Sequence, residues 1–205
     1  VVRKISAKPI SARELDMTKI GSGANFDRKN DFLMVMYHPV TSETDVAAEN
    51  TRNLLEAINE LGIQTLWFWP NFDAGAEKIS HEIRSFKERM KDIKIRFLRY
   101  LPPREFLSLL SKTKCLIGNS SSGIKECSYM GIPVVNIGSR QDGRLKPKNV
   151  IDCGNEKKEI IKSIKKQLQK GKYESSKIYC CNNTSKEISN VLASCKLIVQ
   201  KKFED

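Results

Sequence analysis

Apolar and polar positions form repeating blocks along residues 31–170, and each block predicts a short strand followed by an amphipathic helix. The strands are continuous apolar runs, a pattern typical of strands that are buried on both faces. Predicted strands cover Phe32–Tyr37, Gln64–Trp69, Ile93–Leu98, Lys114–Ile117, Ile132–Ile137 and, as a last short strand, Val150–Ile151. Strands and helices that alternate in this way predict an α/β fold, in which helices cover both faces of a parallel sheet.

The helices between these strands carry apolar residues three or four positions apart, which gives each helix one inner face. The helix that Thr41 or Ser42 can cap has Glu43 and Asp45 in its first turn and ends at Gly62, and Pro102-Pro103 opens another. Further helices are predicted at about Ala74–Arg89, Ile124–Met130, Lys157–Lys170 and about Thr184–Leu197. The inner residues of the second helix are predicted to be Ile79, Ile83, Phe86 and Met90.

Residues 1–30 are polar and show no sustained period, so they are predicted to form a linker with a partial helix around Ala12–Ile20. The domain itself is predicted to cover residues 31–205. The chain does not begin with Met and lacks the apolar core of a signal peptide, so we expect it to be part of a longer protein.

A turn of small hydroxylated residues, Gly118–Gly123, connects the fourth strand to the next helix. The first N–H groups of a helix lack partners and carry a partial positive charge, so such a turn can hold a phosphate. Serines before a helix are also ordinary N-caps, and that interpretation stays open. Glu126 falls one helical turn after Ser122 and predicts a different contact, such as ribose hydroxyls, because a carboxylate repels phosphate.

The next strand leads into a glycine-flanked loop, Gly138–Arg144, which contains Arg140 and Arg144. Consecutive loops after parallel strands meet at the carboxyl edge of the sheet. The serine turn and the arginine loop can therefore converge on one anion, and arginine favours bidentate contact with it.

The composition and charge of the chain argue against several classes of binding partner. The chain has 205 residues, 40% of them hydrophobic, and a formal net charge of +12. The excess lysines lie on the outer face of the predicted helix Lys157–Lys170, without the interleaved aromatic residues of single-strand binders, so no nucleic acid is expected. No apolar run approaches twenty residues, so no membrane span is expected. The six cysteines lack zinc spacing, which predicts reduced thiols in a cytoplasmic protein and no metal site.

Five sequence blocks together resemble the UDP-N-acetylglucosamine 2-epimerase family. They are Tyr37-His-Pro-Val-Thr41, Pro70-Asn-Phe-Asp-Ala-Gly75, Gly118-Asn-Ser-Ser-Ser-Gly-Ile-Lys-Glu126, Gly131-Ile-Pro-Val-Val-Asn-Ile-Gly138 and Arg140-Gln-Asp-Gly-Arg144, with a looser match at Ser176-Lys-Ile-Tyr179. The pattern is similar to the hydrolysing branch, which serves sialic acid and related sugar biosynthesis. The Asp-Ser-Gly-Gly turn of the non-hydrolysing branch is absent from the sequence.

The resemblance implies a Rossmann-like domain that is the C-terminal, nucleotide-binding half of a GT-B-like two-domain enzyme. It implies that Ser120 and Ser121 bind the diphosphate of UDP and that Glu126 binds the ribose. His38, in its Tyr-His-Pro context, would be a catalytic histidine that helps the departing UDP carry its charge. The remaining candidates for contacts with phosphate or sugar are Asn71, Arg140 and Arg144.

The implied reaction starts from UDP-N-acetylglucosamine and yields N-acetylmannosamine and free UDP, with no metal or other cofactor. The family's acid/base carboxylates belong to the N-terminal half, so the isolated chain is expected to bind UDP weakly and to be inactive. A homo-oligomer is expected for the full-length enzyme. Two alternatives stay open: a GT-B glycosyltransferase that holds UDP in the same way, and a non-catalytic module that binds UDP-sugars.

Overall fold

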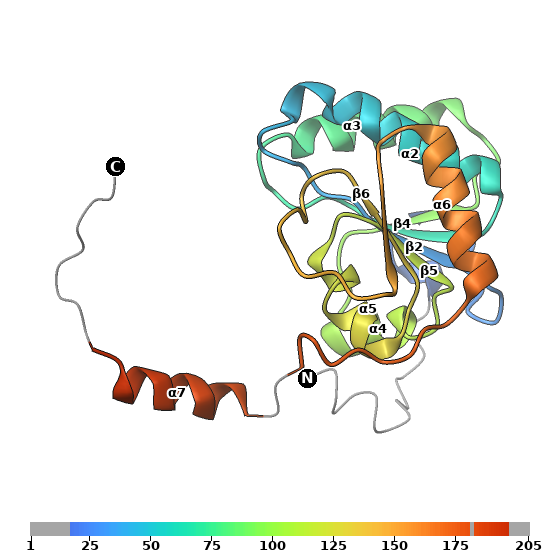
Figure 1. The fold of residues 1–205 in the computed structure, drawn as a ribbon. Coiled ribbons are helices and arrows are strands. Elements are labelled where there is room, and N and C mark those ends of the chain that lie inside the picture. The colour runs from blue at the N-terminus through green and yellow to red at the C-terminus, as the bar shows by residue number, and fades with distance from the viewer. Residues whose placement is uncertain (1–16, 181–182, 197–205) are drawn as a thin grey trace.

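The computed structural model describes residues 17–180 and 183–196, in which helices pack on both faces of a seven-stranded sheet (Figure 1). The α/β fold is confirmed, and the sheet is parallel except for β1 at its edge. The strands are β1 (Ser22–Gly23), β2 (Leu33–Met36), β3 (Thr65–Phe68), β4 (Ile95–Leu98), β5 (Cys115–Gly118), β6 (Val134–Ile137) and β7 (Val150–Cys153). The helices are α2 (Ala47–Leu61), α3 (Ala76–Arg89), α4 (Pro103–Leu110), α5 (Glu126–Met130), α6 (Lys157–Lys170) and α7 (Thr184–Ser194), and 3-10 turns cover η1 (Met17–Lys19), η2 (Thr44–Val46) and η3 (Ser121–Gly123).

The strand order β1-β4-β3-β2-β5-β6-β7 places the topological switch point of the sheet between β2 and β5. From β2 the chain builds outward through β3 and β4, and it then returns to the other side of β2 with β5. Met36 pairs with Gly118 in the parallel register, so the two strands end side by side. Ligands of doubly wound sheets bind in the crevice outside such a switch point, at the carboxyl ends of the strands.

Each face of the sheet has its own hydrophobic core. One core joins residues of α2, α3 and α6 to alternate strand residues such as Leu33 and Val35. The other core joins residues of α4 and α5 to the intervening positions, such as Met34. Figure 1 shows the same arrangement, with α2, α3 and α6 on one side of the sheet and α4 and α5 on the other. The strands are buried on both faces, which is why the sequence showed them as continuous apolar runs.

Two predicted helical features differ from the structure. Met90 was expected inside, but it is 39% exposed, because α3 ends at Arg89 and Met90 is already in extended backbone. The helix expected at Ile124–Met130 begins two residues later: η3 covers Ser121–Gly123, and α5 starts only at Glu126. Ser122 and Glu126 therefore do not share one continuous helix, and the same-face argument for Glu126 is wrong in that form.

The structure describes residues 17–30 of the predicted linker, and these contact the domain. β1 pairs antiparallel with β4 at the edge of the sheet, and Met17 is buried in the second core. Arg96 on β4 holds this segment by donating hydrogen bonds to the carbonyls of Ile20 and Ala24. Residues 1–16, including most of the partial helix predicted at Ala12–Ile20, lie outside the described residues. The domain boundary at residue 31 stays a prediction.

At the other end of the chain, residues 172–180 form an extended strap over the C-terminal end of α5. The amide of Tyr173 donates to the carbonyl of Gly131 at 2.8 Å, and the amide of Ser176 donates to the carbonyl of Ser128 at 2.9 Å. The hydroxyl of Tyr179 donates to the carbonyl of Leu145 at 2.7 Å. The strap therefore links α5 to the chain that leaves the arginine loop.

α7 follows the strap and stands apart from the sheet and its helices in Figure 1. None of its residues that the structure describes is buried, and its predicted last residue, Leu197, lies outside the described residues. Within the described ranges, no helix combines the length and the apolar character that crossing a bilayer requires.

Candidate functional site

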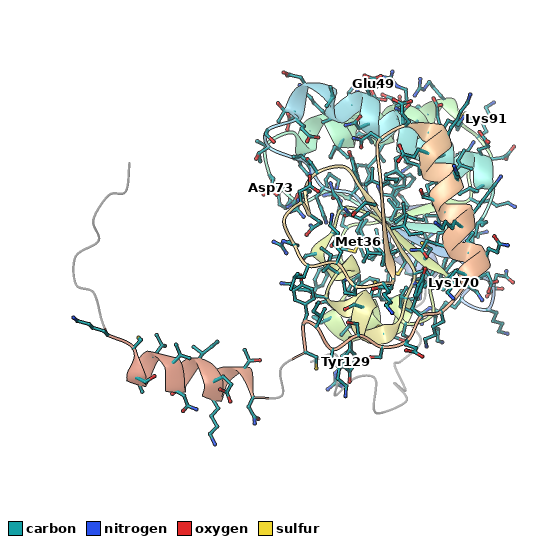
Figure 2. All side chains as sticks on the ribbon, viewed as in Figure 1. Met36, Glu49, Asp73, Lys91, Tyr129 and Lys170 are labelled. Carbon is teal, nitrogen blue, oxygen red and sulfur yellow. The ribbon has the colours of Figure 1, made fainter. Side chains whose placement is uncertain are left out.

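Polar residues that follow four different strands come together at the carboxyl ends of β2 and β5. His38 follows β2, Asn71 and Asp73 follow β3, Asn119 follows β5, and Arg140 and Gln141 follow β6. Figure 2 labels Met36 at the end of β2, and it shows Asp73 on the edge of the domain where the loops after β3 and β6 lie. The sheet thus gathers residues as far apart in the sequence as His38 and Gln141.

Asn119 connects the two strands at the switch point. Its side chain pairs with the backbone of His38: Nδ2 donates to the His38 carbonyl and Oδ1 accepts from the His38 amide, both at 2.8 Å. The amide of Asn119 donates to the carbonyl of Met36 at 3.0 Å. Asn119 is fully buried, so these bonds are shielded from water. The backbone of His38 is therefore fixed relative to the serine turn.

Gly118 makes this close approach of β2 and β5 feasible. Its φ is +126°, and a Cβ atom at this position would lie 2.2 Å from the Met36 carbonyl oxygen. Any side chain would therefore both strain the backbone and push the two strands apart. The glycine that opens the serine turn is thus required by the geometry of the switch point.

The imidazole of His38 is oriented by the loop that follows β3. Its Nδ1 accepts a hydrogen bond from the amide of Asn71 at 3.3 Å. An accepting Nδ1 means that the neutral ring carries its proton on Nε2. The side-chain Nδ2 of Asn71 donates in turn to Asp73 Oδ2, so this loop is held by its own polar groups. His38 can therefore offer an Nε2–H donor to a ligand.

The environment of His38 disfavours its charged form. Burial and the neighbouring Arg140 guanidinium lower the pKa of His38 to about 4, although Asp73 acts in the opposite direction. At neutral pH the ring is therefore uncharged. An anion bound beside Arg140 would offset that positive charge and raise the pKa of His38. The arrangement is suited to hydrogen bonding with an anionic group.

Arg140 supplies the positive charge among these residues. Its Nη1 donates to the carbonyl of Asn119 at 3.3 Å, and its Nη2 lies 3.8 Å from Asp73 Oδ2. The ion pair is partly exposed, so it is weak and can be exchanged for a pair with a ligand. The neighbouring Gln141 is buried and donates from Nε2 to the same Asn119 carbonyl at 2.7 Å.

The serine turn has the geometry of a capped 3-10 turn. Ser120 is its N-cap, with Oγ accepting from the amide of Ser122 at 3.3 Å, and Ser121 begins the turn. The N-cap interpretation from the sequence is thus confirmed, and it leaves the hydroxyl hydrogen of Ser120 available as a donor. Glu126 is the first residue of α5 and is half-buried. The turn lies directly after Asn119, next to His38 and Arg140.

The structure does not bring all the predicted residues together equally. His38, Asn71, Arg140 and the backbone of Asn119 are connected by hydrogen bonds, whereas Arg144 is exposed at the end of its loop. Sequence reasoning missed the roles of Asn119, Gln141 and Asp73, although all three stand inside the recognised blocks. A signal was available, because each is a polar residue directly after a strand or beside a predicted ligand.

A further hydrogen bond connects the arginine loop to the loop after β2: Ser139 Oγ donates to Glu43 Oε1.

Comparison with known proteins gives a consistent result. The family model described as UDP-N-acetylglucosamine 2-epimerase matches residues 6–193. A UDP-N,N'-diacetylbacillosamine 2-epimerase (hydrolyzing) of Legionella pneumophila is 30% identical over 172 residues, which are 84% of this chain and 45% of that protein. A UDP-N-acetylglucosamine 2-epimerase of Neisseria meningitidis is 30% identical over 176 residues, 83% of this chain and 46% of that protein. The chain thus spans about half the length of these relatives.

Solved structures share the fold. The Neisseria meningitidis UDP-GlcNAc 2-epimerase bound to UDP-GlcNAc superposes with a TM-score of 0.64 at 16% identity, over 83% of this chain and 46% of that one. The Methanocaldococcus jannaschii UDP-GlcNAc 2-epimerase in complex with UDP-GlcNAc and UDP gives a TM-score of 0.64 at 16% identity, over 93% and 50% of the two chains. The fold is therefore that of half of a GT-B-like epimerase.

Proposed function

The chain belongs to the UDP-N-acetylglucosamine 2-epimerase family, and on that premise we propose that it is the UDP-binding half of a hydrolysing epimerase. This half is the C-terminal one, and its partner half supplies the acid/base carboxylates. The whole enzyme converts UDP-N-acetylglucosamine into N-acetylmannosamine and UDP, for biosynthesis of sialic acid-type sugars in the cytoplasm. The observation that carries the proposal is the hydrogen-bonded group formed by His38, Asn71, Asn119 and Arg140 at the switch point.

The diphosphate of UDP would lie over the serine turn. Ser120 and Ser121 offer hydroxyl donors, and Arg140 turns its guanidinium from Asp73 to the phosphate oxygens, with Arg144 closing the loop from outside. Arginine pairs with phosphate through two parallel hydrogen bonds, which are stronger than its partly exposed contact with Asp73. Glu126, at the start of α5, accepts hydrogen bonds from the ribose hydroxyls.

His38 would act on the leaving group. In the proposed reaction a base removes the C2 proton of the sugar while the C1–O bond to UDP breaks, which gives a glucal. Water then adds at C1 and a proton returns to C2 from the other face. The departing UDP gains negative charge, and the Nε2–H of neutral His38 can donate to it. Asn71, which orients that ring through its amide, contacts the sugar or the phosphate with its side chain.

The hydrolysing type is supported by two features. The sequence lacks the Asp-Ser-Gly-Gly turn of the non-hydrolysing branch, and the Legionella relative acts as a hydrolysing 2-epimerase by its name. That relative takes a diacetylbacillosamine sugar, whereas the Neisseria relative takes N-acetylglucosamine. We propose UDP-N-acetylglucosamine as the substrate, and the turnover measurement should include both UDP-sugars.

The test has two parts, a binding measurement on this chain and a turnover measurement on the full-length protein. Isothermal titration of the 205-residue chain should show weak, saturable UDP binding, and the chain alone should release no N-acetylmannosamine. The full-length enzyme should release free N-acetylmannosamine and UDP without any acceptor. Release that requires an acceptor would contradict the proposal in favour of a glycosyltransferase. Binding by the full-length protein without any turnover would contradict it in favour of a binding module.

A further inference from the structure

Gln141 is an unusual residue for a buried position. It is 1% exposed, and its Nε2 donates to the carbonyl of Asn119 at 2.7 Å. Because Nε2 must face that carbonyl, Oε1 is fixed as an acceptor, and no donor from the part of the chain that the structure describes reaches it. A buried acceptor without a partner destabilises a fold. Stability alone would favour an apolar side chain here, so the glutamine points to another role.

The Asn119 carbonyl accepts from two donors, Gln141 Nε2 at 2.7 Å and Arg140 Nη1 at 3.3 Å. A carbonyl oxygen has two lone pairs, so it can accept both bonds, and either one alone keeps it from being unpaired. Arg140 is also held by Asp73, at 3.8 Å, so its guanidinium is occupied by the protein itself. Under the proposed function this guanidinium has to turn to the diphosphate, and the Asn119 carbonyl then loses one of its two donors.

We propose that Gln141 is a positioning residue that keeps the Asn119 carbonyl hydrogen-bonded when Arg140 moves to the diphosphate. The inference rests on the proposed function, because it needs an anionic ligand that draws Arg140 away. Asn119 is fully buried, and its side chain holds both backbone groups of His38. A stranded Asn119 carbonyl would therefore disturb the residue that orients His38. In the bound state, Gln141 keeps the Asn119 carbonyl hydrogen-bonded and so avoids the energetic cost of an unpaired buried acceptor.

This role has an energetic consequence that a structural role lacks. Without Gln141, the free protein still satisfies Asn119 through Arg140, and only the bound state has an unpaired carbonyl. Removing Gln141 should therefore weaken the binding of ligands that pair with Arg140, such as UDP. Uridine binding should be unchanged, because uridine has no phosphate. The effect on folding should be small.

The experiment compares Gln141→Met with Gln167→Met, both in the 205-residue chain. Gln167 is a matched control: it is also a buried glutamine whose Nε2 donates to backbone carbonyls, of Val134 and Asn149, but it lies on α6. UDP and uridine are titrated by NMR, which follows weak binding, and the midpoint of thermal unfolding is measured for each variant.

We expect Gln141→Met to bind UDP about tenfold more weakly, to bind uridine as the unaltered chain does, and to unfold at nearly the same temperature. Gln167→Met should unfold at a lower temperature and keep its UDP affinity. Equal weakening of UDP and uridine by Gln141→Met, or no weakening of either, overturns the inference while the proposed function stands. Absence of any UDP binding by the unaltered chain overturns both.

A second measurement covers the case in which Gln141→Met fails to fold. In the unaltered chain, saturation with UDP should shift the NMR signal of the Arg140 guanidinium, while the side-chain amide signals of Gln141 keep their positions. A large shift of the Gln141 amide signals would mean that this residue leaves Asn119 on binding, and that result overturns the inference.

Discussion

Two polar clusters of this domain each contain a buried glutamine that donates to a backbone carbonyl, and the two glutamines differ in how completely they are satisfied. In the α6 cluster, formed by Gln167, Asn149 and Tyr173, the Gln167 amide donates to two carbonyls and accepts from the Tyr173 hydroxyl at 2.8 Å, whereas Asn149 Oδ1 has no donor from the described residues. In the switch-point cluster, formed by His38, Asn119, Arg140 and Gln141, the Gln141 oxygen has no donor from the described residues.

We expect this difference between the two glutamines to separate one that serves the fold from one that serves a ligand. Gln167 has hydrogen-bond partners for both its amide nitrogen and its amide oxygen, as buried groups that hold a fold together do. The switch-point cluster combines an unpaired oxygen, a weak ion pair and a histidine whose pKa is lowered to about 4. Such a cluster is poorly optimised for stability, and perturbed groups of this kind gather at functional sites. The predictions below test whether the two clusters separate in this way.

The largest effects are expected from the glycines beside the clusters. In Gly118→Ala and Gly131→Ala the new Cβ would lie 2.2 Å from the Met36 oxygen and 2.0 Å from the Tyr173 oxygen, respectively. Each should lower the free energy of unfolding by about 3 kcal/mol, because backbone atoms cannot yield as a flexible side chain does. Urea titration measures this. Gly143→Ala, at φ +74° with no heavy atom within 4 Å, is the control and should cost about 1 kcal/mol.

Removing the cation of the switch-point cluster should affect binding more than folding. Arg140→Ala is expected to weaken UDP binding about 30-fold, because a charge-assisted contact to phosphate is lost. It should change thermal stability little, because the ion pair between Arg140 and Asp73 is partly exposed. Isothermal titration gives the affinity. Arg89→Ala, at the end of α3, removes the same charge elsewhere and should leave UDP binding unaltered. A similar loss in both variants would mean that net charge, rather than this site, attracts UDP.

Removing the donor of the α6 cluster should have the opposite profile. Gln167→Met leaves the Val134 and Asn149 carbonyls without this donor and should lower the free energy of unfolding by about 2 kcal/mol. Gln141→Met should lower it by less than about 1 kcal/mol, because its unpaired oxygen is removed together with its donor. Urea titrations of the two variants side by side provide the measurement. Equal losses would contradict the distinction between the clusters.

The pH dependence should trace to His38. Its pKa is depressed from 6.5 to about 4 in the folded chain, so the unfolded chain binds more protons between these values. The contribution of His38 to stability is therefore complete above about pH 6.5 and is lost as the pH falls to about 4. His38→Asn should lose less stability than the unaltered chain between pH 7 and pH 4.5 in urea titrations. Parallel losses in both proteins would assign the pH dependence to other groups.

The smallest effect is expected from the strap that joins the neighbourhoods of the two clusters. Tyr179→Phe removes one exposed hydrogen bond, to the Leu145 carbonyl, and should cost less than about 1 kcal/mol of stability. Because that bond anchors the chain after the arginine loop, UDP affinity should fall two- to threefold at most by isothermal titration. A loss as large as that of Arg140→Ala would make the strap part of the site itself.

The sequence predicted the fold well because local patterns determine it. Apolar runs located the strands, and Gly62 ends α2 in the left-handed conformation that the pattern indicated. The candidate site was predicted in part, since His38, Asn71 and Arg140 each follow a strand and the sheet brings such positions together. The bonds that organise the site were not predictable, because Asn119 meets His38 across 81 positions, and Gln141 meets Asn119 only once β5 and β6 are paired. The break between η3 and α5 was missed for a different reason: the local sequence is compatible with one continuous helix.

A crystal structure of the 205-residue chain with UDP tests the central claim most directly. The account predicts the diphosphate against the hydroxyls of Ser120 and Ser121, the ribose at Glu126, and the Arg140 guanidinium turned from Asp73 to the phosphate oxygens. Nucleotide bound away from the carboxyl ends of β2 and β5, with Arg140 still paired to Asp73, would contradict it.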